Sequence, residues 1–179
     1  MRVMNIPNTL TILRIVLIPV FITAVIYARY RYGLYLFVFA ALTDMLDGLV
    51  ARMTDQKTAL GTFLDPLADK FLLVTSFVLF SVYGWIPKWF TITVISRDLV
   101  VVIGWFLLYL VTQNSRVEPV LLGKLAIALE LVTLAYVLLG LNFPGLPPVP
   151  GVVLLLIAAV TVVSGLQYIY KGFKVTNAS

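Results

Sequence analysis

Four aspartates lie within stretches of this chain that are otherwise apolar, and they are the first candidates for chemistry. Asp44 and Asp47 are three residues apart, and Asp65 and Asp69 are four residues apart. On an α-helix, both spacings place the two side chains on one face. A charge inside a membrane span costs about 2.5–3.5 kcal/mol on insertion scales, so acids retained there are expected to have a function.

The chain offers these carboxylates few chemical partners other than cations. It contains no cysteine and no histidine, which excludes thiol nucleophiles, zinc–thiolate sites and imidazole bases. Four carboxylates at a similar depth repel one another, so they must be protonated or neutralised by cations. Oxygen-only ligands suit hard ions such as Mg²⁺, Mn²⁺ or Ca²⁺. We therefore expect two divalent ions, Mg²⁺ or Mn²⁺, held by the four aspartates for phosphoryl chemistry.

Small residues accompany the acids. Gly48 and Ala51 extend the first stripe, and Gly61 begins the second, four residues before Asp65. Positions without bulk allow a large ligand to approach the backbone closely. Close packing between two membrane helices would explain the same small residues.

The elements that must position these residues are predicted to be membrane-spanning helices. The chain is 61% hydrophobic and 12% charged, with a mean hydropathy of +1.05, which is too apolar for a soluble core. Backbone in lipid must satisfy its own hydrogen bonds, so the spans should be helical. We predict an all-α integral membrane fold, a bundle of six transmembrane helices in one domain (1–179). The expected spans are Thr11–Ala28, Gly33–Met53, Leu60–Gly84, Trp89–Thr112, Pro119–Leu141 and Val149–Tyr170.

The basic residues indicate orientation rather than a nucleic-acid partner. The net charge is +5, but the cations are scattered between apolar stretches. With the N-terminus in the cytoplasm, more of the Lys and Arg residues in the loops fall on the cytoplasmic side. We expect a multi-pass protein of the cell inner (plasma) membrane, with both termini and the active site facing the cytoplasm. Pro7 and Asn8 predict a helix start with Asn8 or Thr9 as N-cap, after a short interfacial segment, Met1–Ile6.

At the aspartates the sequence resembles the CDP-alcohol phosphatidyltransferases. Their pattern is D-x2-D-G-x2-A-R-x8-G-x3-D-x3-D. Every fixed position and gap is present here, as Asp44, Asp47, Gly48, Ala51, Arg52, Gly61, Asp65 and Asp69. The resemblance implies a six-helix membrane bundle, usually a homodimer, and an enzyme of phospholipid biosynthesis that uses CDP-diacylglycerol.

The resemblance also implies a role for each position. Asp44, Asp47 and Asp65 would ligate the metals that bind the CDP-lipid diphosphate. Asp69 would be a metal neighbour and the general base that takes the proton of the acceptor hydroxyl. The remaining motif positions would accommodate the cytidine and the diphosphate, with the arginine nearby: Gly48, Ala51, Arg52 and Gly61.

Further buried cations bear on the acceptor alcohol. Arg97 and Lys124 are candidates for binding a phosphorylated acceptor. Alternatively, Arg97 forms a structural ion pair with an aspartate of the second or third predicted helix, and Lys124 is an interfacial lysine. The opening Asn5–Asn8 with Arg14 resembles phosphatidylglycerophosphate synthases, which use glycerol-3-phosphate. It also resembles cardiolipin synthases of the same superfamily, which use phosphatidylglycerol. Arg97-Asp98 is more similar to the second branch, and glycerol-3-phosphate is the expected acceptor because it is common in bacterial members.

A different class of protein could use the same acids. A cation transporter could hold an ion between the carboxylates, but the sequence shows neither an internal repeat nor obvious broken helices. A purely structural membrane protein would leave the four acids without a purpose. Release of CMP from CDP-diacylglycerol distinguishes the transferase from both alternatives.

Overall fold

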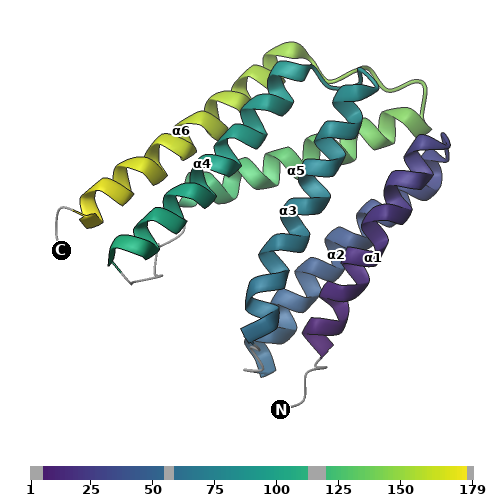
Figure 1. Ribbon diagram of the computed structural model, residues 1–179. Coiled ribbons are helices and arrows are strands. Elements are labelled where there is room, and N and C mark those ends of the chain that lie inside the picture. Colours follow the sequence, from purple (N-terminus) through teal and green to yellow (C-terminus); the bar gives the residue numbers. More distant parts are fainter. Residues whose placement is uncertain (1–5, 55–58, 113–119, 177–179) are drawn as a thin grey trace. The chain divides into compact units, whose positions relative to one another are not determined.

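The computed structural model describes residues 6–54, 59–112 and 120–176, with side chains described for 12–43, 70–104, 106–107 and 120–172. Among these residues the chain forms six helices and no strand (Figure 1). The helices are α1 (Ile6–Ile26), α2 (Tyr30–Thr54), α3 (Ala59–Val82), α4 (Lys88–Thr112), α5 (Leu121–Asn142) and α6 (Gly151–Thr176). The prediction of an all-helical fold is confirmed over the described residues.

The helix bounds follow the predicted apolar segments closely except near the two termini. At the C-terminal end, α6 runs to Thr176, six residues past the predicted Tyr170. Helix α1 begins at Ile6, five residues before the predicted Thr11. Pro7 lies in its first turn, where the missing N–H would have no helical partner. Asn8 and Thr9 lie inside the helix, so the prediction that either is the N-cap was wrong. The predicted interfacial segment falls on residues 1–5, outside the described residues.

The chain divides into two compact units, and each is described by itself. The first comprises Met1–Leu79 and Ala135–Pro147. Within it, α1 packs along α2. Val25 and Phe37 are buried in this contact, and an added Cβ on Gly33 would lie only 3.2 Å from Val25 Cγ2. The amide of Asn142, at the end of α5, donates to the carbonyl of Tyr30 at 3.1 Å and so joins α5 to the start of α2.

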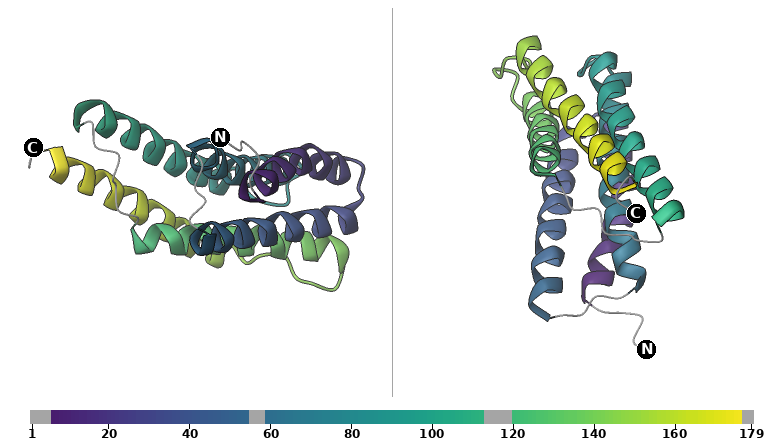
Figure 2. Two further views of the ribbon diagram at one scale, coloured as in Figure 1. Left: turned by 90° about the horizontal axis from the view of Figure 1, so that it is seen from below. Right: turned by 90° about the vertical axis from the view of Figure 1, so that its left-hand side faces the viewer.

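The second unit comprises Phe80–Leu134 and Pro148–Ser179. Here α4 packs along α6, and the two helices run side by side in every view (Figures 1 and 2). Phe80 and Phe90 are fully buried, and the Phe80 ring meets the edge of Trp85 at a centroid distance of 5.4 Å. The N-terminal part of α5, up to Leu134, belongs to this unit.

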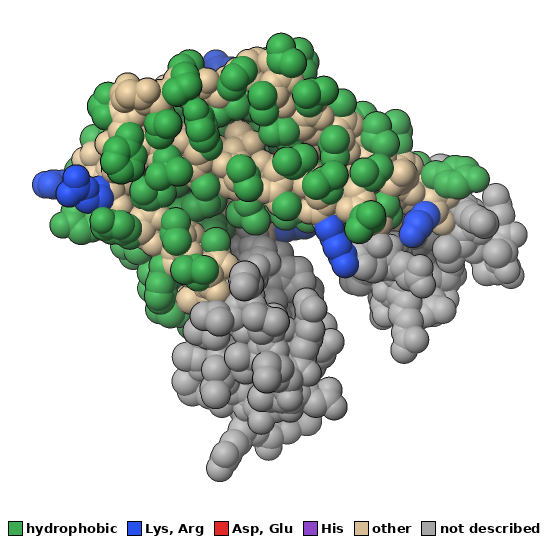
Figure 3. Space-filling model, turned by 180° about the vertical axis from the view of Figure 1, so that it is seen from behind, with side chains coloured by type: hydrophobic (Ala, Val, Ile, Leu, Met, Phe, Trp, Pro, Cys, Tyr) green, Lys and Arg blue, Asp and Glu red, His purple; other side chains and the backbone are tan. Residues whose placement is uncertain are grey.

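Helix α6 has the polarity of a membrane helix. Thr161 and Ser164 are completely buried, whereas Leu155, Leu156 and Leu166 are 60%, 64% and 59% exposed. In water this distribution would expose apolar surface and bury polar groups; in lipid it is the favourable arrangement. Hydrophobic side chains are spread over the described part of the face seen in Figure 3.

Two helices meet the length and composition needed to cross a bilayer, among the residues whose side chains are described. They are Leu121–Asn142, with a mean hydropathy of 2.0, and Gly151–Gly172, with 2.3. About 20 apolar residues span the hydrocarbon core. The segments Ile12–Ile26 and Lys70–Val82 are apolar but shorter within the described part.

Candidate functional site

The predicted metal ligands lie on two consecutive helices. Asp44 and Asp47 belong to α2, and Asp65 and Asp69 belong to α3. The backbone is helical at all four positions, which is the condition on which the predicted carboxylate stripes depend. Residues 55–58 join the helices, so the end of α2 and the start of α3 are at most about 18 Å apart. The side chains of the four aspartates lie outside the part of the chain whose side chains are described.

For the other motif positions, too, the structure describes the backbone only. Three of them occupy α2 and one occupies the first turn of α3, and their side chains also lie outside the described residues: Gly48, Ala51, Arg52 and Gly61. Among the described side chains no group of three or more acids could hold a metal. The four predicted ligands are not in that set, so their role stays a prediction.

Arg97 is the predicted acceptor residue that the structure describes most fully. Its side chain is 4% exposed, and Nη1 donates to Asp98 Oδ1 at 2.8 Å in a buried ion pair. Nε donates to the hydroxyl of Ser164 on α6 at 3.1 Å, and Nη2 lies 3.5 Å from the carbonyl oxygen of Gly123 on α5. One guanidinium therefore links α4, α5 and α6. The structure shows a structural ion pair, but with the neighbouring Asp98 of α4 rather than with an aspartate of the second or third helix as expected.

Two glycines and a tyrosine shape the space around this guanidinium. A Cβ added to Gly123 would lie 2.9 Å from Arg97 Nη2, and one added to Gly165 would lie 3.3 Å from Arg97 Cγ. The Arg97 guanidinium carbon lies 5.7 Å from the centre of the Tyr168 ring, within cation–π range. The Tyr168 hydroxyl accepts the N–H of Val120 at 3.3 Å, just before α5. Arginine is thus accommodated by small residues and held by polar ones.

Lys124, the second predicted acceptor residue, lies in the first turn of α5 and is exposed. It directly follows Gly123, whose carbonyl contacts Arg97. A cation near a helix N-terminus is electrostatically unfavourable, because the helix dipole is positive at that end. An anion bound beside Lys124 would remove this penalty. The structure thus places the two predicted acceptor residues in one neighbourhood of the second unit.

Sequence reasoning missed the polar side of α6. Thr161, Ser164 and Tyr168 recur every three or four residues in an apolar helix, which is the spacing of one helical face. Ser164 accepts from Arg97 and donates to the carbonyl of Thr161 at 2.7 Å. The Thr161 hydroxyl donates to the buried carboxylate of Glu130 at 3.0 Å. A search for polar periodicity within the predicted span would have found this stripe.

Comparison with known proteins decides the family. The model of the CDP-alcohol phosphatidyltransferase family matches residues 4–164, which include both aspartate pairs and the α4–α6 contact. The chain belongs to the CDP-alcohol phosphatidyltransferase family. The family membership predicted from the motif is confirmed.

Named relatives fall in two branches of the family. The chain is 34% identical to a CDP-diacylglycerol–glycerol-3-phosphate 3-phosphatidyltransferase of Aquifex aeolicus, over 96% of this chain and 97% of the relative. It is 32% identical to a probable phosphatidylglycerophosphate synthase of Mycobacterium tuberculosis, over 97% of this chain and 84% of the relative. It is 38% identical to a putative cardiolipin synthase of Mycobacterium bovis, over 54% of this chain. That match spans only about half, 47%, of the relative's length.

Proposed function

We propose that this protein is a phosphatidyltransferase of phospholipid biosynthesis that moves a phosphatidyl group from CDP-diacylglycerol to glycerol-3-phosphate. The observation that carries the proposal is the complete eight-residue family motif on two consecutive helices, α2 and α3. The name of the Aquifex aeolicus relative, which is similar along nearly the whole chain, supports the same donor and acceptor.

The reaction is a substitution at phosphorus. The acceptor hydroxyl oxygen bonds to the phosphorus that carries diacylglycerol, the bond from that phosphorus to the CMP oxygen breaks, and CMP leaves. Asp69 takes the acceptor proton as general base. An ionised carboxylate can do this when it lies within hydrogen-bond reach of the hydroxyl.

The residues of the motif fit divalent ions. Four aspartates are oxygen ligands of the kind that Mg²⁺ and Mn²⁺ prefer, and the chain offers no His or Cys to draw softer metals. Asp44, Asp47, Asp65 and Asp69 would hold two such ions, which would neutralise the diphosphate and the leaving CMP oxygen. The small residues of the motif, with Arg52, would admit the cytidine and the diphosphate.

Arg97 and Lys124 are proposed to bind the phosphate of the acceptor. Arg97 has five N–H donors, and three of them are used by Asp98, Ser164 and Gly123. The remaining two N–H groups are proposed to contact the phosphate. Lys124 adds an exposed cation next to this position.

A second acceptor is favoured by one feature of the sequence. Arg97 is followed by aspartate, which resembles the cardiolipin synthase branch, and a mycobacterial relative bears that name. In this alternative the hydroxyl of phosphatidylglycerol takes the place of glycerol-3-phosphate, and the same aspartates act on it.

The proposed setting is a single membrane domain of six spans, working as a homodimer. The inverted polarity of α6 and the two apolar helices α5 and α6 support membrane placement. The excess of Lys and Arg on one side favours cytoplasmic termini and an active site that faces the cytoplasm of the inner membrane.

A panel of acceptors tests the proposal. Purified protein with CDP-diacylglycerol and Mg²⁺ or Mn²⁺ receives glycerol-3-phosphate, phosphatidylglycerol, inositol phosphate or serine in separate reactions, and CMP release and lipid products are measured. We expect product with glycerol-3-phosphate. Product only with phosphatidylglycerol would establish the alternative, and no CMP release with any acceptor would contradict a transferase.

A further inference from the structure

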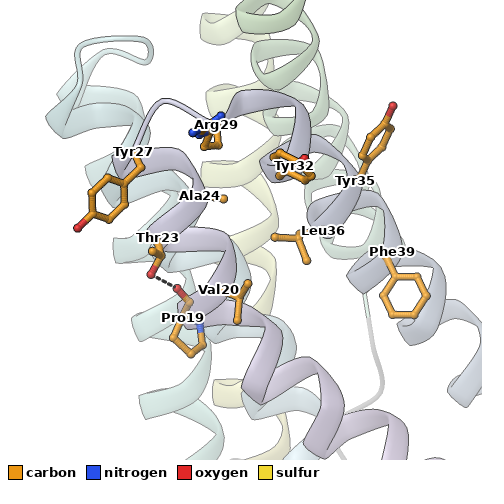
Figure 4. A pocket seen from close by; sticks show the side chains of 10 residues that line it. All are labelled: Pro19, Val20, Thr23, Ala24, Tyr27, Arg29, Tyr32, Tyr35, Leu36 and Phe39. Carbon is orange, nitrogen blue, oxygen red and sulfur yellow. Dashed lines mark hydrogen bonds between the residues drawn. The ribbon is translucent and has the colours of Figure 1, made fainter.

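An apolar groove of about 830 Å³ lies between the end of α1 and the start of α2. Figure 4 shows its lining, with Arg29 at one end between the two helices and Val20 and Phe39 toward the other. Its volume is in the range of small-molecule sites, about 300–1,000 Å³. The residues that line it are Pro19, Val20, Thr23, Ala24, Tyr27, Arg29, Tyr32, Tyr35, Leu36 and Phe39.

The walls of the groove carry almost no unsatisfied polar group. The hydroxyl of Thr23 donates to the carbonyl of Pro19 at 2.8 Å, so its hydrogen bond is made within α1. Val20 and Phe39 are each 48% exposed. Behind the lining, α1 and α2 are held together by the buried rings of Phe21 and Phe37, which are tilted against each other at 6.1 Å between ring centres. Exposed apolar walls on two packed helices fit a hydrocarbon chain.

The backbone of Arg29 is fixed at this end of the groove. Ala28 has a positive φ of 55°, its N–H donates to Val25 O, and the Arg29 N–H donates to Ala24 O at 2.8 Å. These bonds form a Schellman cap on α1. The Arg29 carbonyl accepts the N–H of Gly33 at 3.0 Å, at the start of α2.

The charge at this end of the unit is entirely positive. Arg29 and Arg31 are exposed, and neither has an ion-pair partner among the described side chains. The first acidic residue of the chain is Asp44. Asp44 lies about 21 Å along α2 from Tyr30, at 1.5 Å per residue. A ligand held here would therefore need its negative charge next to Arg29 and its apolar part in the groove.

We propose that this groove binds an anionic phospholipid, with one acyl chain along Val20, Leu36 and Phe39 and the net negative headgroup against Arg29. Tyrosines at the mouth, Tyr27 and Tyr32, suit the level of the headgroups, where aromatic side chains gather. With the proposed orientation, the site faces the leaflet opposite the active site. The proposal rests on the membrane placement proposed above and is independent of the transferase chemistry.

Native mass spectrometry of the detergent-purified full chain tests the site, with phosphatidylserine and phosphatidylcholine of equal chain length as probes. Phosphatidylserine is anionic and is not an acceptor in either proposed reaction. We expect Arg29→Gln to weaken phosphatidylserine binding at least tenfold. Arg31→Gln is the matched control, because Arg31 is exposed two residues away but does not line the groove, and its binding should stay within threefold of wild type.

A second variant fills the groove without touching the charge. Ala24→Phe should also abolish phosphatidylserine binding, and both variants should keep the elution volume and helical circular dichroism of wild type. Unchanged binding in Arg29→Gln or in Ala24→Phe, or equal binding of phosphatidylcholine, would overturn the proposal. Loss of a dimer in Ala24→Phe with phosphatidylserine still bound would overturn it in favour of a second copy of the chain.

Turnover separates this site from the proposed function. At saturating substrates, CMP release by Arg29→Gln should equal that of wild type, since Arg29 lies far from the aspartates. Selective phosphatidylserine binding in a protein that releases no CMP would leave the lipid site standing and refute the transferase. CMP release without selective phosphatidylserine binding would support the transferase and refute the lipid site.

Discussion

Arg97 is held by neighbours from three helices and still keeps donors to spare. Asp98 neutralises its charge, Ser164 fixes Nε, and Gly123 leaves room for Nη2. Such a buried guanidinium is oriented before any ligand arrives, which lowers the entropy cost of binding a phosphate. The same network makes it a structural link between helices. The two roles predict different kinetic effects when the residue is changed.

Replacing Arg97 by lysine should separate these roles. Lysine keeps the charge but lacks the planar fork, so it cannot reproduce contacts with both Asp98 and Ser164. Loss of one charge-assisted bond, about 1.5–3 kcal/mol, should raise the KM for glycerol-3-phosphate about tenfold or more and leave the KM for CDP-diacylglycerol within twofold. Steady-state kinetics with each substrate varied in turn measures both constants.

Ser164→Ala serves as the control for this prediction. It removes the acceptor of Nε and leaves the rest of the guanidinium in place, so its effect on the glycerol-3-phosphate KM should be smaller. A parallel rise in the KM values of Arg97→Lys for both substrates would assign Arg97 a structural role alone. So would a smaller yield of folded Arg97→Lys protein whose KM values equal those of wild type.

The residues of the motif and those of the α4–α6 network differ in how far the sequence predicts them. The aspartate positions follow from charge in an apolar segment and from helical spacing, and the family that their motif indicates is confirmed. Their roles at the site stay a prediction. The partners of Arg97 do not follow in this way. Ser164 is 67 positions away along the chain, and no local pattern indicates which buried hydroxyl an arginine will reach. The one sequence feature that indicates a partner is the spacing of the polar residues along α6.

At the scale of elements, the turn between α1 and α2 carries backbone strain. Ala28 adopts the left-handed conformation at the C′ position of the Schellman cap, where glycine is usual. A Cβ in this conformation costs roughly 1–2 kcal/mol. The left-handed conformation of Ala28 sets the direction in which the chain leaves α1 at Arg29. The same turn therefore places Arg29 at the end of the groove described above.

Ala28→Gly should therefore stabilise the protein. Relief of the Cβ contact, offset in part by the greater freedom of glycine in the unfolded chain, should raise the free energy of unfolding by about 0.5–1 kcal/mol. The reverse change is the matched control. Gly84 has φ of 76° and open space around its missing Cβ, so Gly84→Ala should lose about 1 kcal/mol through backbone strain alone.

Thermal unfolding in detergent, followed by circular dichroism, measures both variants. A lower midpoint for Ala28→Gly would show that the turn is not strained as its backbone indicates. An unchanged midpoint in Gly84→Ala would show that a Cβ at positive φ causes no strain in the turn after α3.

The helices themselves could be predicted from long apolar segments and from the proline-rich stretch before Gly151. The start of α1 was predicted too late, because Asn8 and Thr9 can serve as caps as well as helix residues. Proline at position 7 decides in favour of an earlier start, since it fits the first turn of a helix. Caps are local choices between nearly equal conformations, and neighbouring packing settles them.

At the scale of the molecule, the described residues bury several polar groups within an apolar core and expose many apolar side chains. Thr161, Ser164 and Glu130 are buried, while leucines and valines of α5 and α6 are exposed. The composition predicted a membrane protein, and this distribution is its structural counterpart. The packing of helices within each unit could not be predicted in this way. It depends on long-range contacts, such as that of Asn142 with Tyr30, which residue spacing along the chain does not specify.

The central claim is that the motif aspartates transfer a phosphatidyl group, and acceptor-dependent CMP release by Asp69→Asn tests it most directly. Asparagine cannot accept the proton, so turnover should fall at least about 100-fold, the lower bound for a general base, while CDP-diacylglycerol still binds. Asp55→Asn, which changes an acid at a position that the motif leaves variable, should keep wild-type turnover. Wild-type turnover in Asp69→Asn, or no acceptor-dependent CMP release by the wild-type protein with Mg²⁺ or Mn²⁺, would contradict the account.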